Sequence, residues 1–371
     1  MTAITKNNIK KIAQTARNNS LLRITRYTAM RLVTLFLTVM VGIFLTIMIA
    51  NMGGYVDDIM RAQVREKIIS SYQNNKSFQM MGTEDRKALI DAQCAQEENR
   101  LGLNTPFVIR SFHYLKNALT LDLGSALFMT SDSGSRQVKL ILLERLPATL
   151  LLMGVSQLAL FMLSVLLALT LSRQYGGFWD KLTIALSPTS TAPPWFYGIF
   201  LILIFAAVLK ILPFSGLVDS PPPADKFAYF LSLMKHLLLP AVSLILSGFF
   251  LSIYTWRTFF LIYSSEDYVD MAKAKGVTAR DIERRYILRP TMPNIVTSFA
   301  LTLINVWTGA TITETVFIWP GLGRTLYAAI GLYDTPVIVG DTIIFAYLLA
   351  MTVFLLDIVY VLIDPRVKVG E

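Results

Sequence analysis

Long uncharged segments are the feature that most constrains the fold of this chain. Residues 32–50 follow Arg31 and contain no ionisable side chain. A bilayer core about 30 Å thick requires about 20 such residues in a spanning helix. Further segments of this kind recur, so that 54% of the 371 residues are hydrophobic and only 16% are charged. The pattern predicts an all-α, polytopic membrane protein and not a soluble domain.

The hydropathy pattern predicts about six transmembrane helices. The third contains Pro188, Pro193 and Pro194, which predict a kink, because proline cannot continue the helical hydrogen-bond ladder. An even number of spans places both termini on one side of the membrane. The predicted spans lie at 32–50, between Arg145 and Arg173, between Lys181 and Lys210, between His236 and Arg257, at 293–313 and at 342–363.

Basic residues near the amino terminus predict the orientation. Residues 1–31 contain no Asp or Glu, and short segments rich in Lys and Arg are retained in the cytoplasm. Both the amino terminus and the tail 364–371 are therefore expected to lie in the cytoplasm, and the protein itself is expected in the cell membrane. Binding of nucleic acid is the weaker explanation of the net charge of +9. The basic residues are Lys6, Lys10, Lys11, Arg17, Arg23, Arg26 and Arg31.

The predicted topology divides the rest of the chain. Residues 51–145 fall outside, and residues 146–363 form a membrane core with a cytoplasmic segment at about 257–292. Apolar residues such as Met60 and Val64 recur at helical spacing in the outer region, which predicts an external helical insertion. These apolar faces are expected to pack together, with direct ligand binding as the less favoured alternative.

Several motifs of catalytic or metal-binding chains do not occur. Cys94 is the lone cysteine, and His113 and His236 do not belong to an HExxH pattern. No phosphate-binding loop of the form G-x-x-x-x-G-K-S/T occurs either. The sequence therefore predicts a chain that is not an enzyme and holds no metal or other cofactor, and any use of ATP requires a partner.

The segment between the fourth and fifth predicted spans carries the most specific pattern. Small residues at Ala272 and Ala274 precede Gly276, which is expected to stop a short helix and leave a small-sided surface for another protein. Arg280, Arg284, Arg285 and Arg289 could pair with acidic groups of that partner, or contact lipid headgroups. The residues of the pattern are Asp267, Tyr268, Asp270, Ala272, Ala274, Lys275, Gly276, Arg284 and Pro290.

This segment resembles the cytoplasmic "EAA" loop of bacterial ABC importer permeases. Asp270 stands at the acidic position and Gly276 at the glycine, whereas Met271 replaces the first alanine. The longer string from Asp267 to Gly276 is most similar to the peptide, oligopeptide and nickel permease family. Further stretches resemble that family in the same order, at 101–106, 121–125, 144–150, 212–216, 314–323, 357–360 and 364–366.

The resemblance implies a permease that forms half of a pore. Its partners would be a homologous second permease, with a heterodimer favoured, one or two ATPase subunits that hold ATP and Mg, an external binding protein and membrane lipid. Peptides are the expected cargo, with oligosaccharides or nickel as alternatives. The segment 51–55 departs from the family's Pro-Gly-Asp-Pro turn, and 56–100 is longer than expected. A channel or secondary transporter is the less favoured class, because its spans would carry more polar pathway residues or inverted repeats.

Two further groups of residues are predicted to be functional. A glycine-rich turn at membrane depth needs shelter from protein or a water-filled cavity, which favours a gate or substrate path at the external mouth. Ionisable residues near the last span are expected to have structural partners. The gate candidates are Glu314, Phe317, Trp319, Pro320, Gly321 and Gly323, and the structural charges are Asp357, Asp364 and Arg366.

Overall fold

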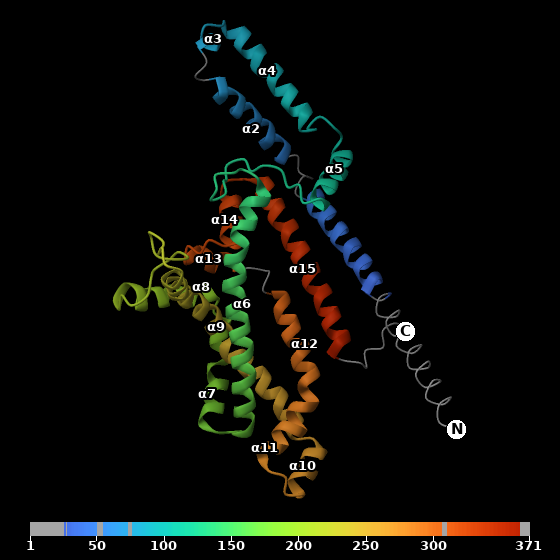
Figure 1. Cartoon of the computed structure of the whole chain (residues 1–371), viewed down its shortest axis with the longest axis vertical. Coiled ribbons are helices and arrows are strands. Elements are labelled where there is room, and N and C mark those ends of the chain that lie inside the picture. The colour runs from blue at the N-terminus through green and yellow to red at the C-terminus, as the bar shows by residue number, and fades with distance from the viewer. Residues whose placement is uncertain (1–25, 27, 50–54, 73–75, 306–309, 364–371) are drawn as a thin grey trace, which may run out of the picture. The chain divides into compact units, whose positions relative to one another are not determined.

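The computed structural model describes residues 26, 28–49, 55–72, 76–305 and 310–363, and Figure 1 shows their helices. An isolated bridge between Ser125 and Gln137 is the sole β-type pairing among them. The all-α prediction is thus confirmed for this part of the chain. The described residues form two compact units: unit 1 contains those within Met1–Leu32, Arg145–Tyr327 and Leu348–Glu371, and unit 2 contains those within Val33–Glu144 and Ala328–Tyr347.

Four helices are long and apolar enough to cross a membrane. They are Thr28–Ile49, α6 (Val138–Arg173), α9 (Lys226–Ser264) and the stretch Thr335–Ile358 of α15 (Thr335–Ile363). With 36 and 39 residues, α6 and α9 are longer than their predicted spans. At about 1.5 Å per residue both exceed the bilayer core, so their ends extend beyond the apolar layer.

The third predicted span is a bent pair of helices. The pair is Phe178–Thr191 and Pro194–Val208, which meet at 100°. It consists of α7 (Phe178–Leu186), the 3₁₀ helix η1 (Ser187–Thr191), α8 (Pro194–Leu201) and the π-helix η2 (Ile202–Val208). The predicted kink is confirmed, and the break is sharper than a kink because Pro193 is extended and Pro194 starts a new helix.

The fifth predicted span is shorter than expected in the described residues. Helix α12 covers Arg289–Asn305 with 17 residues, and 306–309 lie outside the described part of the chain. Its length is about 25 Å, below the thickness of a bilayer core. The described residues therefore give four spans, or five with the bent pair, while the total of six stays a prediction.

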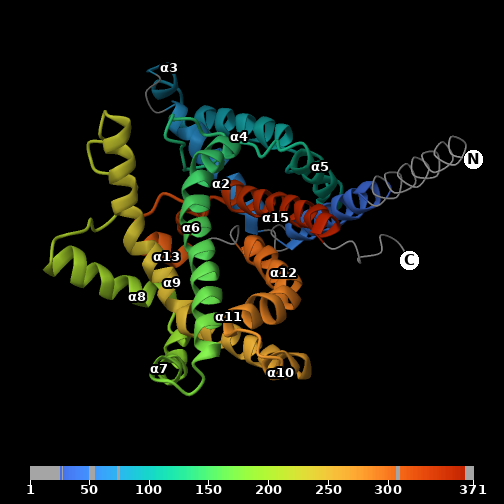
Figure 2. The same cartoon turned by 60° about the horizontal axis from the view of Figure 1, so that its bottom comes forward.

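A buried apolar cluster in unit 1 joins the long helices to the predicted cytoplasmic segment. It includes Ala168 of α6, Phe260 of α9 and Val269 of α10 (Asp267–Ala274). The same cluster receives Ile282 and Ile287 from the π-helix η3 (Ile282–Leu288), which follows α11 (Ala279–Asp281). Figures 1 and 2 both place α10 and α11 at the end of unit 1 that carries α7. Two short helices, α13 (Thr311–Val316) and α14 (Leu322–Gly331), precede α15.

Unit 2 contains the predicted external helices. They are α2 (Tyr55–Tyr72), α3 (Lys76–Gln79), α4 (Thr83–Arg100) and α5 (Phe107–Leu119). Helices α2 and α4 pack against each other. Ion pairs between Arg61 and Glu98 at 2.8 Å and between Arg65 and Asp91 at 3.1 Å join their faces. The hairpin is therefore held by charges as well as by apolar contacts such as buried Val64.

Candidate functional site

Helix α10 is fixed to unit 1 through one face. Val269 is fully buried and Ala272 is 3% exposed, and both belong to the cluster around Phe260. Residues three apart lie on the same side of a helix, which explains why these two point inward together. Ala272 therefore supports α10 from inside, whereas the sequence predicted it on the small-sided outer surface. Val269 was not predicted as a core residue, although its spacing of three residues from Ala272 indicates that both lie on one face of the helix.

The opposite side of α10 is open. Asp270 and Lys273 form an exposed ion pair at 2.8 Å, and Ala274, Lys275 and Gly276 are exposed. Gly276 has φ +72°, and a Cβ added there would meet no atom within 4 Å. Glycine adopts this left-handed conformation without a side-chain clash, so Gly276 ends the helix as predicted. The small-sided outer surface consists of Ala274 and Gly276.

The remaining residues of the predicted pattern lie on both sides of α10. Asp267 begins the helix, and partial burial, followed by the charge of Glu266, raises the pKa of the Tyr268 hydroxyl. Arg284 is exposed on η3, and Pro290 is exposed in the first turn of α12. Pro290 has no N–H to donate to the preceding turn, which fits the irregular π-helix before it.

Two ion pairs connect this segment and its neighbours to the long helices. Arg173 at the end of α6 lies 2.9 Å from Glu283 on η3, whose side chain is 12% exposed. Arg257 near the end of α9 makes two contacts of 2.6 Å with Asp180 in the first turn of α7. Arg173 and Arg257 were predicted only as boundaries of spans. Their partners are distant in sequence, so spacing could not identify them.

The 314–323 loop, taken here to include the end of α13 and the start of α14, is built around a buried carboxylate. Glu314 is fully buried, and it accepts hydrogen bonds from the Thr149 hydroxyl and the Arg324 backbone N–H, each at 2.9 Å. The Thr149 hydroxyl also accepts from the Leu322 N–H at 2.7 Å. A Cβ at Gly321 would lie 2.5 Å from that hydroxyl oxygen, so glycine is required for the close approach.

The aromatic residues of the same loop pack into unit 1. The Trp319 indole N–H donates to the Ala148 carbonyl oxygen at 2.8 Å, and its side chain is fully buried. Phe317 packs against Gly198 of α8, where a Cβ would come within 2.7 Å of its ring. Pro320 is half-buried and Gly323 is buried. The structure thus brings the predicted gate residues together as a tightly packed loop on α6 and α8.

Asp357 has a structural neighbour in unit 1. Its carboxylate forms an ion pair with the Arg31 guanidinium, which lies close to the start of the first described helix. The other two predicted structural charges, Asp364 and Arg366, lie outside the described residues. The pair gives the ionisable residue of the last span a counter-charge, as the cost of a charge in hydrocarbon requires.

Unit 2 contains a carboxylate that organises a loop. Asp334, fully buried before α15, accepts hydrogen bonds from the backbone N–H groups of Leu127, Phe128 and Met129 at 2.8–3.1 Å. The Asp-Thr-Pro sequence at 334–336 is typical of a helix start, but it does not predict hydrogen bonds from residues so distant in sequence. The carboxylate therefore holds the loop before α6 against the start of α15.

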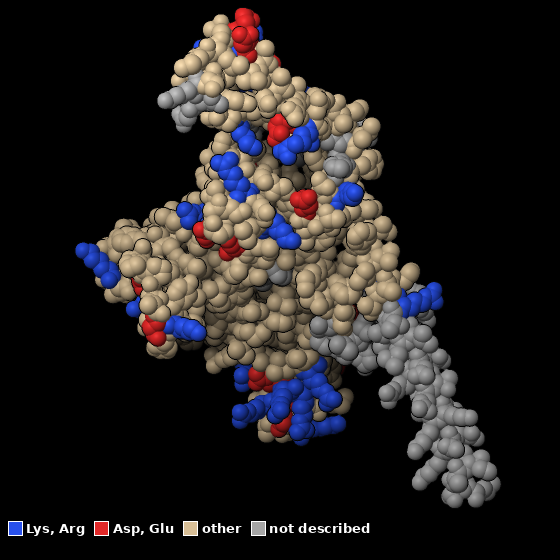
Figure 3. Space-filling view, turned by 45° about the horizontal axis from the view of Figure 1, so that its top comes forward, with Lys and Arg blue, Asp and Glu red and all other residues tan. Residues whose placement is uncertain are grey.

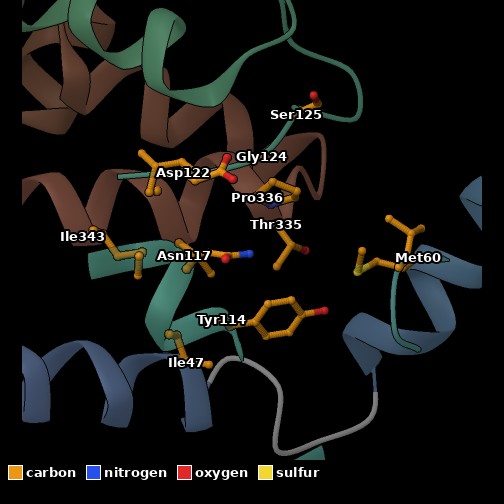
Figure 4. A pocket seen from close by; sticks show the side chains of 15 residues that line it. Ile47, Met60, Tyr114, Asn117, Asp122, Gly124, Ser125, Thr335, Pro336 and Ile343 are labelled. Carbon is orange, nitrogen blue, oxygen red and sulfur yellow. The ribbon is translucent and has the colours of Figure 1, made fainter. Parts of the chain in front are cut away.

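A cavity of about 240 Å³ lies in unit 2. Tyr114 and Asn117 of α5 border it together with Ile47 and Ile343, and Asp122 is its charged lining residue (Figure 4). The lining is mainly apolar. This cavity is separate in sequence from all residues predicted to act in coupling or gating.

Metal ligands do not cluster in the described part of the chain. Within those residues no group of three or more His, Cys, Asp or Glu side chains is placed to hold a metal ion.

Comparison with known protein families gives one match that covers most of the core. Residues 148–369 match the family described as "Binding-protein-dependent transport system inner membrane component". The matched region includes α10, the 314–323 loop and α15.

Individual relatives are similar over about three quarters of the chain. The di/tripeptide transport system permease protein DppB of Pseudomonas aeruginosa is 30% identical over 296 residues, which cover 75% of this chain and 86% of that protein. The oligopeptide transport system permease protein AppB of Bacillus subtilis is 28% identical, with 72% and 83% covered. The dipeptide transport system permease protein DppB of Escherichia coli K12 is 27% identical, with 74% and 85% covered.

Proposed function

We propose that this chain, which belongs to the family of binding-protein-dependent transport system inner membrane components, is the permease of an ATP-driven importer of di- or oligopeptides. The observation that carries this proposal is the family match over 148–369, together with relatives whose names specify peptide transport. As a multi-pass membrane subunit, the chain provides a pathway and not the ATPase activity.

The partners follow from the mechanism of such an importer. A homologous second permease completes the pore, an external binding protein delivers peptide, and one or two ATPase subunits bind ATP and Mg on the cytoplasmic side. In this orientation both termini of the chain and α10 face the cytoplasm, and α2 to α5 face outward. The basic segment 1–31 and the arginines near η3 support that orientation.

Coupling to the ATPases is assigned to the exposed side of α10. Ala274 and Gly276 offer a surface without large side chains, which permits close approach of another protein. Val269 and Ala272 anchor the other side in the core shared by α6 and α9. A push on α10 would thus act on two long helices, while Arg173 and Glu283 resist sliding of η3 against α6.

The gate is assigned to the 314–323 loop. Its support is the buried network of Glu314 and Thr149 and the packing of Trp319 on α6. A loop held in this way moves with α6 as one body, because packed interiors shift between discrete arrangements and do not deform smoothly. Alternating access would then open and close the external mouth.

Reconstitution tests the function directly. The chain would be assembled in vesicles with its second permease and ATPases, and ATP hydrolysis measured with its binding protein and either a dipeptide, an oligopeptide, an oligosaccharide or Ni²⁺. We expect that, among these substrates, only the peptides stimulate ATP hydrolysis. Stimulation only by the oligosaccharide or by Ni²⁺ would show that the cargo is not a peptide. Transport by vesicles that contain this chain alone would show that it is a channel or secondary transporter.

A further inference from the structure

A hollow of about 570 Å³ lies along one side of the helix that leaves the cytoplasmic segment. Its lining comes from one continuous stretch, α11, η3 and the start of α12. Hydrogen bonding in a π-helix joins residues five apart, so side chains four and five positions apart gather on one side. Figure 3 shows Lys and Arg gathered over this end of unit 1. The lining residues are Asp281, Arg284, Arg285, Leu288, Arg289 and Met292.

The hollow has an excess of positive charge. Arg285 lies 3.5 Å from Asp281, and their side chains are 73% and 46% exposed, which makes this a weak pair. Arg284 and Arg289 have no carboxylate within 4.0 Å among the described residues. Three guanidinium groups therefore share one carboxylate, and guanidinium groups match phosphate oxygens with paired hydrogen bonds.

Charged and apolar side chains share the lining. Leu288 and Met292 border the same hollow, and Met292 is 48% exposed. After Arg289 the chain has no ionisable residue through Asn305. The hollow therefore lies where a charged helix enters an apolar segment, at the expected boundary between water and bilayer.

We propose that Arg284, Arg285 and Arg289 bind the phosphate of an anionic phospholipid, whose acyl chain contacts Leu288 and Met292. A phosphate with an attached acyl chain satisfies both halves of the lining. An acidic protein surface would satisfy only the arginines. Basic pockets beside membrane helices on the cytoplasmic side are suited to anionic headgroups. The cytoplasmic leaflet rests on the proposed orientation, whereas the headgroup contact does not.

The bound lipid would stabilise η3, the helix that packs in the same core as α10. Ile282 and Ile287 of η3 pack in the same core as Val269 and Ala272. Neutralising the clustered arginines removes repulsion on the outer side of η3. Coupling in the assembled importer is therefore expected to be stronger in vesicles that contain anionic lipid.

Lipid retention tests the site without requiring transport. The full-length chain would be purified in detergent, incubated with phosphatidylglycerol or phosphatidylcholine, and bound lipid counted by native mass spectrometry. Arg284→Gln with Arg289→Gln should lower the affinity for phosphatidylglycerol about tenfold. The matched control is Lys275→Gln with Arg280→Gln, which removes two exposed charges of the same segment outside the hollow and should retain the lipid.

A second variant separates geometry from charge and guards against misfolding. Arg284→Lys with Arg289→Lys keeps both charges but removes the forked donors, so an intermediate loss is expected. Equal loss in the control pair, equal retention of phosphatidylcholine, or binding of inorganic phosphate as tightly as phosphatidylglycerol would overturn the site. So would unchanged lipid retention combined with loss of the ATPase subunits from the Gln variant, since that result assigns the arginines to a protein contact.

Discussion

Arg257 and Asp180 form a buried ion pair with two parallel contacts, Nε to Oδ1 and Nη2 to Oδ2, each at 2.6 Å. The Gly176 N–H donates to the same carboxylate at 2.9 Å, and the Tyr175 ring lies 5.0 Å from the guanidinium carbon. The pair therefore joins the turn after α6 and the start of α7 to the end of α9. That end of α9 leads directly into α10.

Removing one member of this pair is expected to destabilise the chain. Arg257→Gln or Asp180→Asn leaves one buried charge without its partner, at a cost of about 3–5 kcal/mol. The apparent melting temperature of the purified chain should fall clearly in both. Arg65→Gln is the matched control, because its pair with Asp91 is about half exposed and contributes less than about 1 kcal/mol.

The double variant separates charge from packing. Asp180→Asn with Arg257→Gln leaves no buried charge unpaired, so it should be more stable than the Arg257→Gln single variant. Melting temperatures in which the two single losses simply add would show that the charges do not depend on each other.

The spans were predictable from sequence, but their ends and bends were not. The length of a segment without charged residues predicts where a helix can cross the membrane, and this prediction agrees with the first, second, fourth and last spans. It cannot predict how far a helix continues into water, because α9 extends beyond Arg257 to Ser264 through packing in the buried cluster. Three prolines predicted the break in the third span but not its 100° angle, and the second helix of the pair, α8, packs against α9, which is remote in sequence from those prolines.

The candidate site was predictable where its signals are local. Gly276 was identified as a helix stop from its position, and its φ of +72° agrees. The prediction that Ala272 faces outward was wrong, because an alanine fits both a partner-binding surface and a packed core. Ion pairs such as Arg173 with Glu283 join residues 110 positions apart, and one sequence contains no signal for such pairing.

Gly321 is expected to tolerate no side chain. In Gly321→Ala the new Cβ would lie 2.5 Å from the Thr149 hydroxyl oxygen and would also meet the Glu314 carboxylate. The loop must then shift or lose the Thr149–Glu314 hydrogen bond, at a cost of about 1–3 kcal/mol. Melting temperature and peptide uptake should both fall.

Gly154→Ala provides the comparison in the same membrane core. A Cβ at Gly154 in α6 meets no atom within 4 Å. Alanine favours helix over glycine, so this variant should be as stable as wild type or slightly more stable. Equal effects of the two substitutions would contradict a tightly packed loop.

Cys94 is expected to react slowly and only at high pH. Its thiol is buried on α4, and burial raises its pKa above the ordinary value. Since the thiolate is the reactive form, a raised pKa means less thiolate at a given pH. The rate of maleimide labelling should therefore rise at a higher pH than for Ser71→Cys in a Cys94→Ala background, where the residue is exposed. A midpoint equal to or below that of the exposed cysteine would contradict this environment.

The orientation can be checked with single cysteines in the Cys94→Ala background. Cysteine at Asn18 or Thr278 should be protected from an impermeant thiol reagent in intact cells, because both positions belong to segments rich in Lys and Arg. Ser71→Cys on α2 should be labelled. Labelling at Asn18 or Thr278 without permeabilisation would reverse the proposed topology.

Bulky substitutions on the open side of α10 should uncouple the importer without unfolding the chain. Gly276 has free space around it, so Gly276→Val adds backbone strain of about 1 kcal/mol but no internal clash. Ala274 is exposed, so Ala274→Trp also leaves the core intact, whereas Ala272→Trp would disrupt the buried cluster. Membrane abundance of the first two variants should remain close to wild type.

The assembled complex is where the two variants should fail. Overlap with an ATPase groove cannot be absorbed by a packed interface, so peptide-stimulated ATP hydrolysis in reconstituted vesicles should be lost in both. Ala95→Trp, at an exposed alanine of α4, controls for the added indole and should retain stimulation. If Gly276→Val and Ala274→Trp also retained full stimulation, α10 would be a solvated connection and the ATPases would have to bind elsewhere.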